Sequence, residues 1–150
     1  MSERVHVGLV PVEQILPLRH MVLRQGLPFE SAKFDHDHTE GSVHFAAFDS
    51  QNSADVIGCC TLVRQPYEGQ PAWQLRGMAV DERARKLGVG RRLLDAAEAH
   101  ISATPYSTIW WCNARIVAVP FYERLGWQIV SPLFDIPTAG PHHRMMRRIE

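Results

Sequence analysis

The stretch LRGMAVDERARKLGVGRRLL, residues 75–94, begins with the pattern of a strand and ends with the pattern of a helix. Its apolar residues Leu75, Met78 and Val80 predict the second half of a strand over 73–80. Apolar residues at helical spacing then predict a helix over 88–103. The turn between the two should bind an anion, because the first amides of a helix lack internal hydrogen-bond partners and lie at the positive end of the helix dipole.

The residues of this turn suit a phosphate. Gly88 and Gly90 carry no side chain, so a phosphate can approach the backbone closely. The basic side chains of Arg85, Lys86 and Arg91 flank them. The dinucleotide pattern Gly-x-Gly-x-x-Gly is absent, and so is the Gly-Lys-Ser or Gly-Lys-Thr of nucleoside-triphosphate loops. What remains is Arg85-x-x-Gly88-x-Gly90 after an apolar strand.

A second stretch, NARIVAVPFYERLGW at residues 113–127, follows the next expected strand. Together the two stretches resemble the GNAT superfamily of acyl-CoA-dependent N-acyltransferases. In that family a pyrophosphate-binding turn precedes a strand that ends in asparagine, a helix with Phe-Tyr, and then Leu-Gly and an aromatic residue. The resemblance covers most of the chain in element order and is strongest over 75–127. The segment GPHHRM at 140–145 is similar to the ElaA-like branch of the superfamily.

The resemblance implies a binding site for acetyl-CoA, the common donor of the family, and no metal. The backbone of the first strand would bind the pantetheine arm as an added strand, amides of the turn would bind the pyrophosphate, and two later side chains would lie near the acyl group and the sulfur. Lys86 stands where the family has a glycine, a change that leaves the amide in place. The implied cofactor-binding residues are Met78, Ala79, Val80, Arg85, Lys86, Gly88, Val89, Gly90, Arg91, Asn113 and Tyr122.

The resemblance also implies a catalytic role for Tyr122, as the general acid that protonates the departing thiolate. A phenol titrates near ~10, so it carries its proton at neutral pH. The helix pattern alone favours the alternative that Tyr122 is a buried core aromatic. A backbone amide of the strand, that of Met78, is expected to stabilise the oxyanion. The general base is open among Glu30, His44, His142 and His143, and Arg76, which stands where some relatives have a carboxylate, favours a water relay.

Two functions of different classes follow. The first is an N-acetyltransferase that acts on a small-molecule amine, or less readily on a protein terminus or lysine. The second is a non-catalytic acyl-CoA-binding sensor or partner module with the same fold. Both need the glycine turn, and only the first needs Tyr122. The acceptor itself stays open, because in this fold the first helices and the last hairpin determine it.

The expected fold is α/β (α+β), one GNAT-like domain over 1–150. A mixed central sheet of about six to seven strands, with a parallel pair at 73–80 and 108–112, is flanked by about four helices. The strand 56–64 is apolar on both faces and should be central, and Gly77 in mid-strand predicts a bulge or a close approach, with a packing glycine as the alternative. Other strands are expected at 5–9, 43–48, 127–133 and 142–149. Other helices are expected from 11 or 12 with Pro17 as a kink or a restart, over 29–34, and over 116–125 with a start at 117–119 because of Pro120.

Composition narrows the remaining classes. The chain of 150 residues has a formal net charge of +0 and a pI near 7.1, which argues against nucleic acid and anionic membranes as partners. No apolar run approaches the ~20 residues that span a bilayer, and the start has no signal-peptide pattern. The 3 cysteines are expected to be reduced core residues of a cytoplasmic protein, and the 4 tryptophans to lie in the core. The polar segment 35–42 is expected to be a solvated loop, with a metal site at His36 and His38 as the weaker alternative, and a homodimer is left open.

Overall fold

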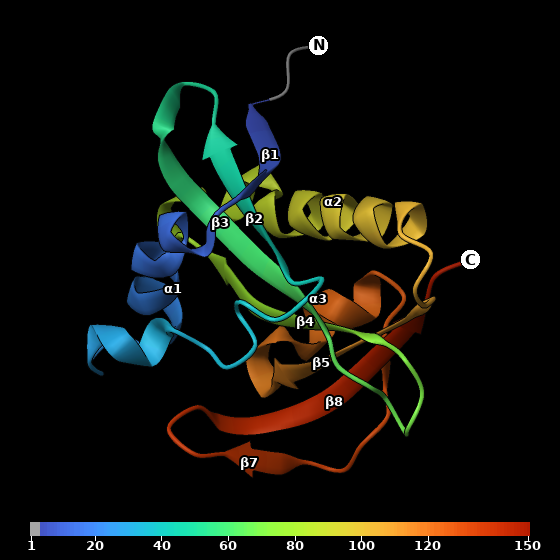
Figure 1. Cartoon of the computed structure of the whole chain (residues 1–150). Coiled ribbons are helices and arrows are strands. Elements are labelled where there is room, and N and C mark those ends of the chain that lie inside the picture. The colour runs from blue at the N-terminus through green and yellow to red at the C-terminus, as the bar shows by residue number, and fades with distance from the viewer. Residues whose placement is uncertain (1–3) are drawn as a thin grey trace.

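The computed structural model describes residues 4–150, and for residues 52–54 the backbone only. Within this range a single 8-stranded sheet has the order β1-β2-β3-β4-β5-β8-β6, with β7 paired to β8 (Figure 1). The strands are β1 Val5–Val10, β2 Val43–Asp49, β3 Asn52–Arg64, β4 Trp73–Val80, β5 Ile109–Arg115, β6 Gln128–Ile129, β7 Phe134–Ile136 and β8 Gly140–Arg148. The β4–β5 pair is parallel and the other pairs are antiparallel. The expected α/β fold and its parallel pair are confirmed.

Helices cover both faces of the sheet. The α-helices are α1 Leu16–Leu23, α2 Val89–Ala103 and α3 Val119–Arg124, and the 3-10 helices are η1 Val12–Gln14, η2 Phe29–Ala32, η3 Glu82–Leu87 and η4 Ile116–Ala118. The larger core cluster joins α2 and α3 to one face, and a second cluster joins η1, α1 and η2 to the other. We call these the α2 face and the α1 face.

The core is built as the sequence pattern predicts. Cys59, Cys60, Leu62 and Val63 of β3 are all fully buried, which agrees with the central position of this strand between β2 and β4. All four tryptophans are buried. The three cysteines are free and buried, and burial raises the pKa of the Cys59 thiol to about 12. These thiols are therefore neutral core groups, as expected.

Two prolines set the helix starts. Pro17 lies in the first turn of α1 and Pro120 in the first turn of α3. A proline is accepted in the first turn because its missing N–H would have no partner there anyway. The restart at Pro17 and the late start of the helix at Pro120 are both confirmed, with 3-10 turns just before each one.

The C-terminal third differs most from the expectation. The strand expected over 127–133 is reduced to the two residues of β6, and β7 adds a strand that no local pattern indicates. β5 extends to Arg115, past the expected end at Cys112, because β8 pairs with it over its whole length. Within the described residues, no helix combines the length and the apolar character needed to cross a membrane.

Candidate functional site

The parallel strands β4 and β5 separate partway along their length. They pair at Trp73 with Trp110, at Gln74 with Trp111 and at Leu75 with Cys112, and the pairing then stops although both strands continue. β4 stays paired with β3 on its other side as far as Val80. From residue 76 to residue 80, β4 thus has one free edge, whose backbone groups can accept an extended ligand as an added strand.

Gly77 forms a bulge at the start of this free edge. Its φ is 61°, and β4 has one residue more than β3 between the pairs Thr61–Arg76 and Cys59–Ala79. A Cβ at Gly77 would lie 3.0 Å from Nε of Arg19. The bulge and the close approach are both confirmed, and the approaching group is an arginine side chain from α1.

A buried polar cluster supports the bulge from the α1 face. The Arg19 side chain is fully buried and forms an ion pair with Asp37 at 2.8 Å. It also donates to Oγ1 of Thr61 and to the carbonyl oxygen of Ala32, both at 2.8 Å. Such a buried pair holds its surroundings in one arrangement, because removal of either partner leaves an uncompensated charge.

Segment 35–42 is a loop as expected, with His38, Thr39 and Glu40 exposed, but this cluster buries one of its residues. Asp37 is 6% exposed, and its carboxylate neutralises the buried Arg19. Its backbone carbonyl oxygen accepts a hydrogen bond from Nε2 of His44 at 2.9 Å. No group of three His, Cys, Asp or Glu side chains that could hold a metal ion occurs among the described residues. Arg19, a charge within the apolar stripe of a helix, signals in the sequence that a buried partner is needed, but it does not identify Asp37.

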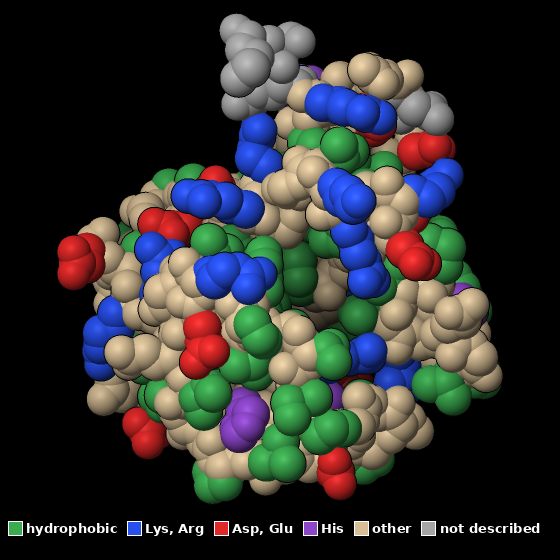
Figure 2. Space-filling model, turned by 180° about the vertical axis from the view of Figure 1, so that it is seen from behind, with side chains coloured by type: hydrophobic (Ala, Val, Ile, Leu, Met, Phe, Trp, Pro, Cys, Tyr) green, Lys and Arg blue, Asp and Glu red, His purple; other side chains and the backbone are tan. Residues whose placement is uncertain are grey.

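The glycine turn lies beside the free edge of β4. Gly88 has a φ of 71° and begins α2 without a side-chain cap, so the first amides of this helix have no side-chain partner. Arg85, Lys86 and Arg91 are exposed around it. Figure 2 shows this side of the molecule, hollowed at its centre, with hydrophobic side chains in the floor and Lys and Arg side chains along the rim. The arrangement can bind a polyanion at the helix start.

The two other residues of the turn are determined by packing. A Cβ at Gly90 would lie 2.9 Å from Cζ of Phe121, so a larger residue would displace the Phe121 ring where α3 packs on α2. Val89 is 1% exposed and its side chain packs in the core, so its backbone amide is the only group that it could offer to a ligand. The sequence argument explains the glycine at position 90 by the close approach of a phosphate. The contact of Gly90 with α3 is a second reason for a glycine at this position.

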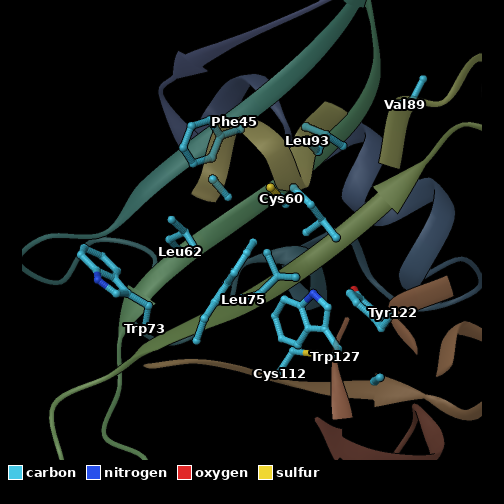
Figure 3. Close-up of a cluster of buried hydrophobic side chains, with 14 of the residues drawn as sticks. Phe45, Cys60, Leu62, Trp73, Leu75, Val89, Leu93, Cys112, Tyr122 and Trp127 are labelled. Atoms are coloured by element: carbon cyan, nitrogen blue, oxygen red, sulfur yellow. The ribbon is translucent and has the colours of Figure 1, made fainter. Parts of the chain in front are cut away.

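Tyr122 lies in the core of the α2 face. It is 5% exposed, and its ring centroid is 5.3 Å from that of Trp127 (Figure 3). Burial, with smaller contributions from Cys112 and Cys60, raises the pKa of Tyr122 well above its ordinary value. Its hydroxyl has no hydrogen-bond partner among the residues that the structure describes. Tyr122 thus holds a proton at neutral pH that no described neighbour accepts.

Asn113 and Tyr122 belong to the same sequence motif, but they lie on opposite faces of the sheet. Its neighbours Cys112 and Ala114 belong to the core cluster of Tyr122, so the alternation of β5 directs Asn113 to the α1 face. Its Oδ1 accepts a hydrogen bond from Nε of Arg144 at 3.2 Å. A ligand that passes between β4 and β5 would therefore have Tyr122 on one face and Asn113 on the other.

The structure reduces the set of candidate bases. Both ring nitrogens of His44 are occupied, Nδ1 by Thr61 at 2.8 Å and Nε2 by the carbonyl oxygen of Asp37. Desolvation by burial lowers the pKa of His44. Glu30 is exposed and paired with Lys33. Nδ1 of His142 is hydrogen-bonded to the carbonyl oxygen of Gly140, and Nδ1 of His143 to that of Ser131. Among the described contacts, Nε2 of neither histidine has a partner.

Comparison with known proteins finds one family and a group of similar structures. The model of the acetyltransferase (GNAT) domain matches residues 40–129. The uncharacterized N-acetyltransferase YitI of Bacillus subtilis (strain 168) is 30% identical over 145 residues, 97% of each chain. The crystal structure of Escherichia coli ElaA superposes with a TM-score of 0.78 at 16% identity, over 96% of this chain and 99% of that one. An aminoglycoside 6'-N-acetyltransferase complexed with coenzyme A gives 0.75 at 18% identity, over 97% of both chains.

Proposed function

Because the chain belongs to the GNAT acetyltransferase family and is an acyltransferase, we propose that it moves an acetyl group from acetyl-CoA to the amino group of a small molecule. The observation that carries the proposal is the free edge of β4 beside the uncapped start of α2. One feature suits an extended amide-bearing arm, and the other suits a pyrophosphate. Their adjacency matches the two parts of coenzyme A.

The binding roles follow from this geometry. The free backbone groups of Met78, Ala79 and Val80 hold the pantetheine arm. The amides from Arg85 to Arg91 hold the pyrophosphate, with Lys86, Gly88, Val89 and Gly90 between them and exposed basic side chains around them. Acetyl-CoA supplies the activated thioester. Asn113 orients the arm from the α1 face.

The transfer uses a polar donor on each side of the thioester. The amide of Met78 donates to the carbonyl oxygen as negative charge develops there during attack by the free amine. The C–S bond breaks as the C–N bond forms, and Tyr122 donates its proton to the departing thiolate. Water takes the proton that the acceptor nitrogen loses, and a proton from water restores Tyr122. The dry surroundings that raise the pKa of Tyr122 also raise the pKa of the neighbouring Cys60 thiol. A thiolate released beside Tyr122 would be similarly more basic, which offsets the raised pKa of the donor.

A binding experiment tests the anion site first. Calorimetric titration of the protein with CoA, acetyl-CoA and S-acetylpantetheine is compared for wild type, Arg85→Gln, Lys86→Gln and the remote control Arg4→Gln. A lost hydrogen bond to a charged group costs about 1.5–3 kcal/mol, so we expect the first two variants to bind CoA at least about tenfold more weakly. Arg4→Gln should bind CoA like wild type. S-acetylpantetheine, which lacks the pyrophosphate, should not distinguish the variants.

A turnover experiment tests the transfer. CoA release from acetyl-CoA is followed with a thiol reagent against a library of small amines and against peptides with free termini or lysines. We expect turnover with small amines. A folded protein that binds no CoA would refute the proposed site, and CoA binding without transfer to any amine would support the alternative role as an acyl-CoA sensor.

A further inference from the structure

We propose that the acceptor amine also carries an anionic group, a carboxylate or a phosphate, which is bound by four arginines on the α1 face. This inference rests on the proposed function and specifies its substrate class. The four residues, the arginine group, come from different elements: Arg24 from the end of α1, Arg76 from β4, Arg115 from β5 and Arg144 from β8.

Strand pairing brings three of these residues together. Asn113 pairs with Arg144 across β5 and β8. Leu75 and Cys112 form the last pair of β4 and β5, so Arg76 and Asn113 are the first residues beyond it, on the two sides of the point where the strands separate. Arg115 lies two residues beyond Asn113 on the same face. All these side chains flank the point where β4 and β5 separate, and Arg76 directly precedes the bulge.

The end of α1 adds the fourth arginine. Nη2 of Arg115 donates to the carbonyl oxygen of Leu23 at 3.0 Å, and Nη2 of Arg24 donates to Oγ1 of Thr138 at 3.1 Å. Figure 1 shows α1, the carboxyl end of β5 and the turn between β7 and β8 on the same side of the molecule. The group therefore lies where the first helix and the last hairpin meet beside the open strands.

The positive charge of this group is not neutralised by the protein. All four side chains are half-buried, and none forms an ion pair with a carboxylate of the described residues. Asp35 and Asp37 act on Arg76 only at longer range, and Asp37 already pairs with Arg19.

Many hydrogen-bond donors also remain free. A guanidinium has five N–H donors. Arg76 uses two of its nitrogens, on Oε1 of Gln74 and the carbonyl oxygen of Asp35, both at 2.8 Å. Arg144 uses one nitrogen and stacks on Trp111 with its Cζ 4.6 Å from the ring centroid. Nε of Arg24 is buried without a partner.

Such a group is unfavourable without an anion. Desolvation lowers the pKa of Arg76 and Arg115, and Arg24 lowers that of Arg115 further by repulsion. Partly desolvated like charges destabilise the free protein, and a carboxylate or phosphate with several oxygens would satisfy both the charge and the free donors. An anion bound here would keep the amine of the same molecule within reach of the separated strands.

The test compares acceptors that differ only in charge. Matched sets contain one amine as its carboxylate, its carboxamide and its phosphate-bearing counterpart. We expect kcat/KM for the carboxylate or the phosphate form to exceed that for the carboxamide at least about tenfold, and the comparison of the two anions identifies which one the site prefers. A carboxamide that is used equally well or better would overturn the inference.

Variants locate the effect. Arg115→Gln should lower kcat/KM for the anionic acceptor at least about tenfold through KM, and leave kcat/KM for the carboxamide and the Kd for acetyl-CoA unchanged. Arg144→Gln also removes the hydrogen bond to Asn113, so its readout is the ratio of kcat/KM for the anionic acceptor to that for the carboxamide, which should fall at least about tenfold. Arg115→Lys should recover part of the loss, and Arg4→Gln should have no effect. Equal losses for anionic and neutral acceptors would refute the arginine group as the anion site. A wild type that binds acetyl-CoA and acetylates neutral amines only would refute this inference and leave the proposed function intact.

Discussion

The hydroxyl of Tyr122 is a single polar atom in a cluster of aromatic and sulfur-containing side chains. The Phe-Tyr motif in the sequence identifies the residue, but the apolar pattern of its helix equally predicts a core aromatic. Burial fits both interpretations. Removal of the hydroxyl distinguishes them, because a general acid loses its proton donor whereas a core aromatic keeps its packing.

We predict that Tyr122→Phe folds normally and lowers kcat by about a hundredfold at neutral pH, the lower end of the range for a lost general acid. The stability should change little, since no described group accepts a hydrogen bond from the hydroxyl. The measurement is steady-state turnover with acetyl-CoA and an accepted amine, beside urea unfolding. Tyr106→Phe, at a partly exposed tyrosine, is the control. Full activity of Tyr122→Phe would leave Tyr122 as a core residue only.

Single residues also show where sequence reasoning stops. Gly77 in mid-strand predicts a bulge or a close approach, and the structure confirms both over the alternative of a packing glycine. Asp37 is not predictable, because its ion pair with Arg19 joins two segments 18 residues apart and depends on the path of the intervening chain. The arginine group is hidden in the same way, since its members come together only through the pairing of β4, β5 and β8.

At the scale of elements, the contact of α2 with α3 depends on a missing side chain. Cζ of Phe121 would lie 2.9 Å from a Cβ at Gly90, whereas a Cβ at Gly88 would have nothing within 4 Å. Gly88 is needed for its φ of 71°, and Gly90 is needed for space. The two glycines of this Gly-x-Gly motif are thus needed for different physical reasons, one for backbone conformation and the other for packing.

We predict that Gly90→Ala destabilises the fold by about 1–3 kcal/mol through overpacking against Phe121. Phe121→Leu in the same chain should relieve part of this loss. Gly88→Ala should cost about 1–2 kcal/mol through its left-handed backbone, and Phe121→Leu should not relieve it. Urea unfolding of the two double-mutant cycles measures both couplings. Additive effects for Gly90→Ala and Phe121→Leu would contradict the packing argument.

The elements that could be predicted have their cause in local sequence. The bounds of β4 agree with the expectation, α2 begins within one residue of it, and both helix restarts lie at prolines. β6 and β7 have no such local cause: Gln128 and Ile129 of β6 are exposed, and both strands are held by pairing with β8. Edge strands of this kind are determined by the partner strand, which a local pattern does not contain.

At the scale of the whole molecule, a buried histidine, His44, and a half-buried one, His100, couple folding to pH. His44 is held in the polar cluster of the α1 face. His100 of α2 packs against the rings of Phe45 and Trp73 on the other face, with centroid distances of 6.0 and 5.8 Å. Desolvation lowers the pKa of both histidines below the ordinary value of 6.5. The folded protein therefore binds protons at these two sites less readily than the unfolded chain.

The sign of the pH dependence follows from this difference. Above the ordinary value of 6.5 both sites are neutral in the folded and unfolded states and have no effect on stability. As the pH falls below that value the unfolded chain takes up protons first, so the free energy of unfolding decreases, by at most about 1.4 kcal/mol per pH unit for each histidine. The carboxyl groups of Asp49 and Asp81, whose pKa values are lowered from 3.8, add their loss only at lower pH.

We therefore predict that the free energy of unfolding decreases between about pH 6.5 and pH 5, and that His44→Gln or His100→Gln makes this decrease shallower. Urea unfolding at steps of pH measures the slope, which is the readout because either variant also changes the absolute stability through lost contacts. His6→Gln, at an exposed position of β1, is the control. A slope unchanged in both His44→Gln and His100→Gln would mean that the two sites bind protons equally well in the folded and unfolded states, which contradicts the desolvation argument. A shallower slope in only one variant would assign the pH dependence to one face of the sheet, the polar cluster beside the bulge or the aromatic packing of α2.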